Sequence, residues 1–150
     1  MATQLTPHFT LEEFTLSQTA ARMGLSNQPT GQDLDNVHST AEAMERVRSV
    51  LGDKPILISS GYRCPAVNQA CGGSSTSAHM VGLAADFTCP GFGSPIDICL
   101  KLQPHLAELK VDQLIHEYDS WVHLGIAGPG QMPRQQCLTI DAGGTSSGFA

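Results

Sequence analysis

The sequence predicts an α+β fold in which helices pack on a small antiparallel sheet, and three observations favour this class. The first third of the chain has helical periodicity. Short apolar, often β-branched runs bounded by turn residues follow it. In the remainder, expected strands and helices are mixed along the chain. This order, helices first and then both kinds of element, favours α+β.

The first expected helical region covers residues 9–24 and contains one or two short helices. Thr10 is suited to cap its start because Glu13 follows three residues later, which completes a capping box, and Gly24 ends it. A long helix is expected at residues 31–52, with acidic residues early and arginines late, as the helix dipole favours. Its apolar residues recur every three or four positions: Leu34, Val37, Ala41, Met44, Val47, Val50 and Leu51.

Short strands and two further helices account for most of the remaining chain. A helix is expected at residues 64–73, where Pro65 suits the first helical position, and another at 94–109. Asp119 and Ser120 mark a turn between the last two main strands. The expected strands are residues 54–61, 82–89, 111–118 and 120–126, with a candidate edge strand at 136–140.

Length and composition indicate one globular domain. At 150 residues and 41% hydrophobic, the chain is long enough to bury a sizeable core. We expect residues 1–140 to form this domain and the Gly- and Ser-rich residues 141–150 to form a flexible tail. The five cysteines are an odd number, and without a secretion signal they are interpreted as reduced thiols, although two of them, such as Cys64 and Cys71, could pair.

Charge and hydropathy exclude two classes of partner. Eight basic residues against fourteen acidic ones give a net charge of −6, and no Lys/Arg cluster is present, so we expect no nucleic-acid partner. No apolar stretch reaches 18 residues, so we expect no membrane partner. The first 14 residues lack the basic flank and apolar run of a signal peptide, so we expect synthesis in the cytoplasm.

The stretch STSAHMVGLAADF, residues 75–87, contains the strongest chemical signal. Asp86 has apolar neighbours in sequence, and a buried carboxylate needs a hydrogen-bonding, cationic or metal partner. His79 lies seven positions earlier, and His123 lies on an expected strand whose flanking residues point to the other face. Two histidines and a carboxylate with an open fourth position form a recurrent catalytic zinc arrangement, which activates water.

Four segments of the chain resemble a known family of zinc peptidases. SAHMVGLAADF resembles the S-x-H-x-x-G-x-A-x-D signature of the lysostaphin, D-Ala-D-Ala carboxypeptidase and sonic hedgehog relatives, the LAS metallopeptidases. ISSGYRCPAVNQACGG and FTLEEFTLSQTAARMGLSNQP resemble segments of the D-Ala-D-Ala carboxypeptidase and phage endolysin branch, and DQLIHEYDSWVHLGI resembles its closing strand pair. The resemblance covers residues 8–127 and implies a hedgehog-like peptidase fold.

The resemblance implies a role for five residues around a Zn²⁺ cofactor. It implies that His79, Asp86 and His123 are the zinc ligands. It implies that Arg63 holds a substrate carboxylate or polarises the scissile carbonyl, since a guanidinium suits either task. Ser77 is a candidate for a hydrogen bond to the substrate or for orienting a ligand, with simple turn chemistry as the alternative.

At the position of the general base, this sequence departs from the family pattern. Many members have an acid three positions before the last histidine, where this chain has Ser120. Glu117 and Asp119 are the two candidates, and we favour Glu117, which resembles the glutamate that ends the equivalent strand in the endolysin-like branch. Asp119 suits the turn better. His116 is a candidate for supporting a zinc ligand by a hydrogen bond, although it and Glu117 point to opposite faces of a regular strand.

The function implied is hydrolysis of a peptide bond in peptidoglycan stem peptides, by an endolysin-type L-Ala-D-Glu endopeptidase or by a D-Ala-D-Ala carboxypeptidase. The alternative is a zinc-containing binding or virion structural module with no activity, which the serine at position 120 favours. We expect a monomer that acts at the bacterial cell wall, during host lysis or as part of a virion.

Overall fold

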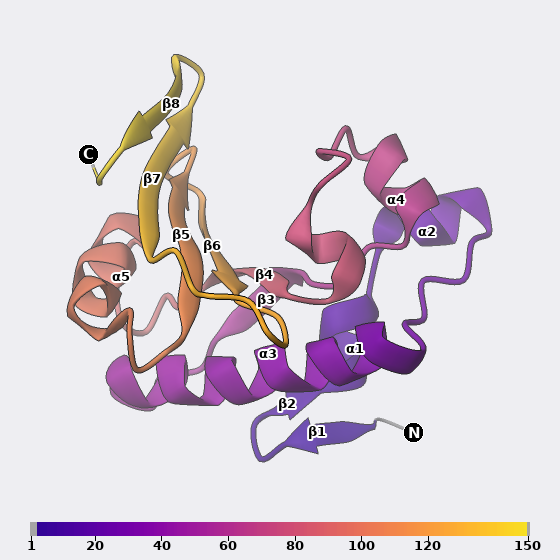
Figure 1. Cartoon of the computed structure of the whole chain (residues 1–150), viewed down its shortest axis with the longest axis horizontal. Helices are drawn as coiled ribbons and strands as arrows, with labels where there is room; N and C mark the ends of the chain where they lie inside the picture. The colour runs from indigo at the N-terminus through magenta and orange to yellow at the C-terminus, as the bar shows by residue number, and fades with distance from the viewer. Residues whose placement is uncertain (1–2, 150) are drawn as a thin grey trace.

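The computed structural model describes residues 3–149 and has the expected α+β class. The chain begins with a small antiparallel hairpin, continues through three helices and then enters a six-stranded sheet (Figure 1). The elements before the sheet are β1 (Gln4–Thr6), β2 (Phe9–Thr10), α1 (Leu11–Thr15), α2 (Gln18–Met23) and α3 (Gly31–Val50). The expected capping box forms at α1, where Thr10 and Glu13 each accept a hydrogen bond from the other's backbone N–H.

The main sheet has the strand order β3-β4-β6-β5-β7-β8. All neighbouring strands are antiparallel except β5 and β7, which are parallel. The sequence predicts an antiparallel sheet, and the structure adds one parallel pair of strands to it. The strands are β3 (Leu57–Ser60), β4 (Ala84–Thr88), β5 (Val111–Glu117), β6 (Trp121–Ile126), β7 (Gln136–Asp141) and β8 (Gly144–Ser147).

The remaining helices are short. The expected helix at residues 94–109 is divided into α5 and a 3₁₀ turn that contains Pro104, since a proline lacks the N–H that would continue the helix. The cysteines Cys64 and Cys71 cap opposite ends of one helix, and all five cysteines are free thiols. These elements are α4 (Pro65–Ala70), η1 (Ala78–Val81), α5 (Pro95–Leu102) and η2 (Gln103–His105).

The end of the chain differs from the expected flexible tail. Residues Gly144–Ser147 form strand β8, which pairs with β7 in antiparallel register. The pairing is extended by the N–H of Gly148, which donates to the carbonyl of Cys137. Every residue of β8 is exposed, so no hydrophobic alternation marks it in the sequence. Backbone hydrogen bonds hold this strand in place.

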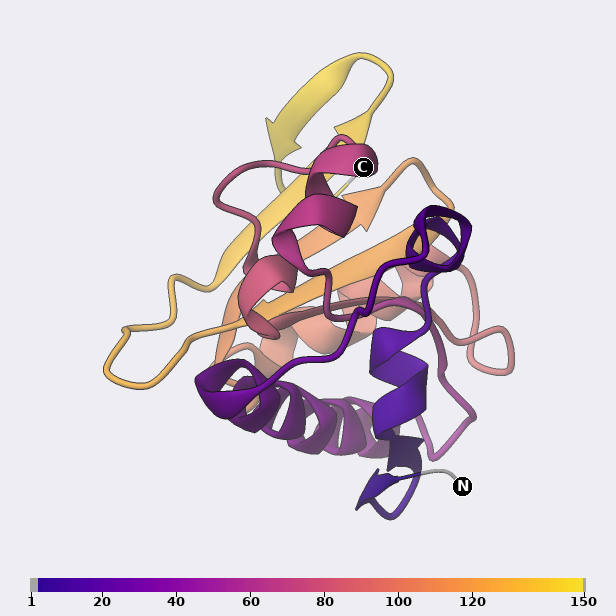
Figure 2. The same cartoon turned by 90° about the vertical axis from the view of Figure 1, so that its right-hand side faces the viewer.

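The core lies between α3 and the sheet. Val37, Met44 and Val47 on α3 are almost fully buried and belong to the same apolar cluster as Phe87 on β4 and Leu124 on β6. Figures 1 and 2 show α3 along one side of the molecule and the β7–β8 hairpin at the opposite side. The expected long helix therefore supports the sheet that carries the candidate site.

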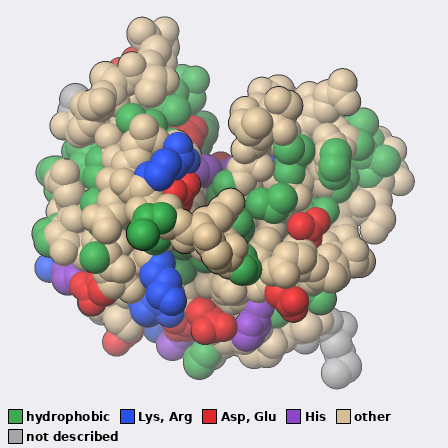
Figure 3. Space-filling view, in the orientation of Figure 1, with side chains coloured by type: hydrophobic (Ala, Val, Ile, Leu, Met, Phe, Trp, Pro, Cys, Tyr) green, Lys and Arg blue, Asp and Glu red, His purple; other side chains and the backbone are tan. Residues whose placement is uncertain are grey.

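A hollow opens between the part of the molecule that carries the β7–β8 hairpin and the part that carries α4. Figure 3 shows this hollow, with histidine and acidic side chains visible inside it. Within residues 3–149, no helix combines the length and apolarity needed to cross a membrane.

Candidate metal centre

The register of three neighbouring strands brings the expected site residues onto one face of the sheet. Asp86 on β4 lies directly opposite His123 on β6, and His123 lies opposite Ile115 on β5. Cross-strand partners share a face, and alternate residues of a strand return to that face. Glu117, two residues after Ile115, therefore lies on the same face as Asp86 and His123 and next to them.

Asp86 lies between the two histidines. Its Oδ1 atom is 2.9 Å from Nδ1 of His123 and 3.2 Å from Nε2 of His79. These three ligand atoms lie within 4.8 Å of one another, and no other such metal-holding group of His, Cys, Asp and Glu occurs among residues 3–149. Burial alone would raise the pKa of Asp86, but hydrogen bonds from His123 and His79 outweigh it and hold the pKa well below its usual range.

His79 is held in a ligand-like orientation by its local backbone. It lies in the η1 turn, where the Ser77 hydroxyl accepts a hydrogen bond from the His79 N–H and where Gly82 ends the turn at φ +81°. Its ring Nδ1 is 2.6 Å from the carbonyl oxygen of Gly61. A carbonyl can only accept, so Nδ1 carries the proton of this contact, and Nε2 is the ring nitrogen that faces Asp86.

The donor set fits a zinc ion. Nε2 of His79 and Nδ1 of His123 face the same carboxylate oxygen of Asp86. A zinc ion would take one ligand atom from each of these three groups, and the hydrogen bond from Nδ1 of His79 to a carbonyl is the usual outer support of a metal-binding histidine. Two imidazoles and one carboxylate are the ligands of many catalytic zinc sites.

Gly61 lies against the backbone of Phe14, and we predict that Gly61→Ala destabilises the protein. A Cβ at this position would lie 2.5 Å from the carbonyl oxygen of Phe14 and 2.7 Å from its Cα, so the chain that anchors His79 must move. We expect a loss of about 1–3 kcal/mol in the free energy of unfolding, measured by urea denaturation. Gly91→Ala is the matched control because its Cβ would meet nothing closer than 3.6 Å. Equal stabilities of the two variants would contradict this account.

Glu117 lies at the edge of the three-residue cluster. Its Oε1 atom is 3.9 Å from Nδ1 of His123, and its side chain is 18% exposed. Burial, helped by the negative charge of Asp86, raises the pKa of Glu117, against the opposing effects of His123, Trp121 and Arg63. A carboxylate with a raised pKa beside a metal site is suited to take and return a proton.

The other candidate acid, Asp119, is placed differently. Its side chain is 76% exposed, and Oδ1 lies 3.0 Å from Nε2 of His116. His116 precedes Glu117 in a regular part of β5, so its ring lies on the opposite face of the sheet. Asp119 and His116 therefore interact with each other at the turn after β5, away from the cluster.

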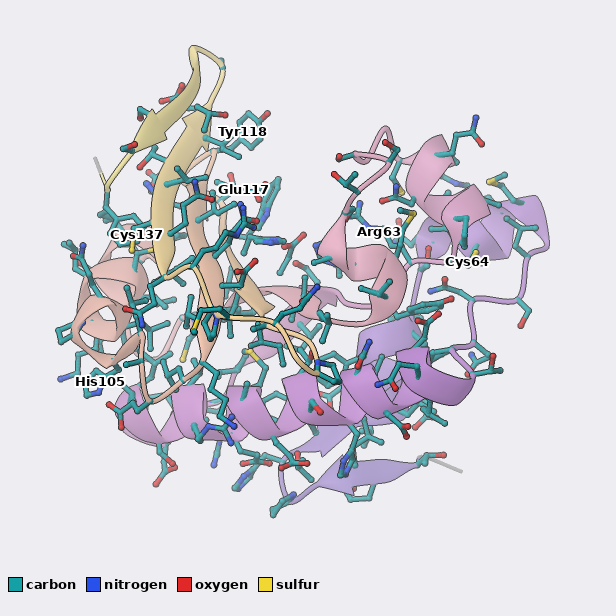
Figure 4. The ribbon with its side chains drawn as sticks, in the orientation of Figure 1. Arg63, Cys64, His105, Glu117, Tyr118 and Cys137 are labelled. Atoms are coloured by element: carbon teal, nitrogen blue, oxygen red, sulfur yellow. The ribbon has the colours of Figure 1, made fainter. Side chains whose placement is uncertain are left out.

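Arg63 approaches the cluster from the chain that follows β3. Its backbone N–H donates to the carbonyl of His79, and its Nη2 lies 3.5 Å from the hydroxyl of Ser77. Its Nε is buried without a hydrogen-bond partner, and among residues 3–149 it forms no salt bridge. Figure 4 shows Arg63 and Glu117 on opposite sides of the hollow. A cation with unused donors in this position is available to an anionic or carbonyl group.

Comparison with known proteins agrees with this geometry. The family model described as peptidase M15 matches residues 7–125, which is most of the chain. The chain belongs to the peptidase M15 family. This M15 chain is also 41% identical over 51 residues to the zinc D-Ala-D-Ala carboxypeptidase of Streptomyces albus G. The matched stretch is 34% of this chain and only 20% of that relative's length.

Family membership confirms the resemblance to the LAS peptidases, and together with the donor set it bears out the expected Zn²⁺ cofactor. Two groups of the M15 site were not identified from the sequence. The Gly61 carbonyl is a backbone atom and leaves no side-chain signal. Trp121 lies directly opposite Glu117, which only the β5–β6 register reveals.

Proposed function

We propose that this M15 protein is a zinc-dependent peptidase that hydrolyses a peptide bond in bacterial peptidoglycan stem peptides. The observation that carries the proposal is the convergence of His79, Asp86 and His123 beside a second carboxylate, Glu117. A site that served zinc binding alone has no need of the second carboxylate. The name of the Streptomyces relative, a zinc D-Ala-D-Ala carboxypeptidase, supports the substrate class.

In this proposal Nε2 of His79, the carboxylate of Asp86 and Nδ1 of His123 hold the zinc ion. Zinc supplies Lewis-acid chemistry, which polarises a carbonyl and makes water more acidic. Glu117 accepts the proton of the attacking water and returns it to the leaving amine, so the carboxylate ends the cycle as it began. Its half-buried position keeps it close to His123 and limits competing contacts with solvent.

Arg63 binds the substrate in this proposal. Its guanidinium holds a carboxylate of the stem peptide or the developing negative charge on the scissile carbonyl. Ser77 contacts both the metal-binding and the substrate-binding part of the site. Its hydroxyl caps the turn that carries His79 and lies 3.5 Å from Nη2 of Arg63. Ser77 thus orients a ligand of the metal and steadies the substrate-binding cation.

The peptide bond that is cut determines the specific activity. We propose that the protein is either an endolysin-type L-Ala-D-Glu endopeptidase or a D-Ala-D-Ala carboxypeptidase. We further propose that residues 1–140, together with strand β8, act as a single domain and as a monomer at the cell wall, during host lysis or from a virion.

Mass spectrometry of purified muropeptides incubated with the protein, with and without a chelator, tests the proposed function. We expect chelator-sensitive cleavage. Fragment masses then identify the L-Ala-D-Glu bond or the loss of the terminal D-Ala. Intact muropeptides, after incubation with protein shown to contain zinc, would contradict the proposal.

One observation favours a second candidate, a zinc-containing binding or virion structural module without activity. Ser120 occupies the position where many relatives have an acid, and its hydroxyl donates to the carbonyl of Tyr118 within the turn. In a binding module, replacement of Glu117 would change nothing measurable, whereas in a peptidase it would stop turnover. The variant Glu117→Gln therefore separates the two functions.

A further inference from the structure

The indole N–H of Trp121 is a buried donor that no acceptor meets at full hydrogen-bond geometry. Its Nε1 atom is shielded from solvent, and in the described range 3–149 no acceptor meets it at full hydrogen-bond geometry, although it already interacts with the Glu117 carboxylate. A buried donor is normally paired, so an incompletely paired one beside a candidate active site points to the acceptor nearest to it. The proposed mechanism does not use this group.

The position of Trp121 makes Glu117 the natural partner. The two residues are direct cross-strand partners at the closed end of β5 and β6, so their side chains share the face that carries His123. The ring of Tyr118 packs against that of Trp121 with centroids 5.7 Å apart and planes tilted by 41°. The indole is therefore held beside the carboxylate by the strand register and by an aromatic neighbour.

The turn that joins the two strands is also restrained. Tyr118 and Asp119 both adopt left-handed backbone conformations, at φ 52° and 51°. A turn with two such residues matches the twist of the flanking strands. This geometry fixes the separation of Glu117 and Trp121 across the strand pair.

We propose that Trp121 is a positioning residue, whose indole N–H donates to one carboxylate oxygen of Glu117 and thereby directs the other oxygen toward His123 and the metal centre. The inference rests on the proposed function, in which Glu117 moves the proton. A carboxylate held through one oxygen loses rotational freedom, so its second oxygen spends more time in reach of the attacking water. In this structure Oε1 is already the oxygen nearer His123.

Nuclear magnetic resonance tests the contact without any assay of activity. The chain has a single tryptophan, so a ¹H–¹⁵N spectrum contains one indole signal, which belongs to Trp121. We expect Glu117→Gln to move the indole proton upfield, because a bond to a neutral amide oxygen is weaker than a bond to a carboxylate. The matched control is Glu108→Gln, the same change at an exposed site, which leaves the signal in place. An indole signal unmoved by Glu117→Gln would overturn the inference.

Replacement of the single tryptophan by β-(3-benzothienyl)alanine tests the consequence for turnover. This analogue keeps the shape of the ring system and replaces only the N–H by sulfur, so a merely structural role would be preserved. We expect kcat to fall about tenfold, as for loss of one hydrogen bond to a charged group, while KM and bound zinc stay unchanged.

Each other outcome has a defined meaning. An unchanged kcat, or a change in KM alone, would overturn the inference, the latter because it would place the indole on the substrate. A wild-type protein without peptidase activity would overturn the proposed function. The indole signal would then still decide whether Trp121 holds Glu117.

Discussion

Replacing Glu117 by glutamine is expected to stop hydrolysis of stem peptides while zinc remains bound. Glutamine has the same shape but cannot take a proton from water, and Glu117 lies outside the three-residue cluster, with its Oε1 3.9 Å from Nδ1 of His123. Loss of a general base lowers kcat by about 10²–10⁴-fold. Steady-state kinetics on a defined stem peptide and zinc content by elemental analysis measure the two quantities.

Asp119→Asn is the control for this experiment. Asp119 is exposed and interacts with His116 on the opposite face of the sheet, so its replacement is expected to leave kcat within about twofold, as for surface substitutions in general. If Asp119→Asn lost turnover and Glu117→Gln kept it, the assignment of the base would be reversed. If neither variant lost turnover, the chain would use another base.

Replacing Asp86 by alanine is expected to abolish both zinc binding and hydrolysis. The Asp86 carboxylate is the only anion among the three proposed ligands, and its Oδ1 lies within 3.2 Å of both histidine nitrogens. Even loss of a group that merely supports a ligand weakens metal binding by about 10–100-fold, so loss of a ligand itself should exceed this. Calorimetric titration with Zn²⁺ measures the affinity of the variant.

Asp35→Ala is the matched control for the loss of zinc, since Asp35 is an exposed aspartate on α3. It should bind zinc as the wild-type protein does. If Asp86→Ala retained wild-type zinc affinity, the metal would lie elsewhere on the chain.

The sequence predicts those features of the fold that depend on a single helix or strand. The periodicity of α3 identified Val37, Met44 and Val47 as a buried face, and the structure buries all three. Alternation along β5 separated His116 from Glu117, and the regular register of that strand bears this out. Both patterns depend only on the residue period of a single element.

The sequence does not predict which strands pair with one another or in which register. Nothing in residues 82–89 or 120–126 states that Asp86 lies opposite His123, because register depends on how the whole strands pair. The N-terminal hairpin and β8 escaped prediction for a different reason. Their strands are short, and β8 has no buried residue, so backbone hydrogen bonds between segments define them without a hydrophobic pattern.

The candidate site likewise has features that the sequence predicts and features that only the structure reveals. The residue types and spacing of His79, Asp86 and His123 suggested zinc before any geometry was known, but the general base stayed open between Glu117 and Asp119. The structure separates these two acids by placing them on opposite faces of β5 and its turn. The support of His79 by the Gly61 carbonyl and the place of Trp121 beside Glu117 needed the folded chain.

The most direct measurement is a titration of metal-free wild-type protein with Zn²⁺, in which bound zinc and the rate of stem-peptide hydrolysis are determined on the same samples. We expect hydrolysis to be absent at the start, to rise in proportion to bound zinc and to level off when each chain holds a single ion. Full hydrolysis by the metal-free protein, or none by the zinc-loaded protein, would contradict the assignment of this centre as the active site of a peptidase.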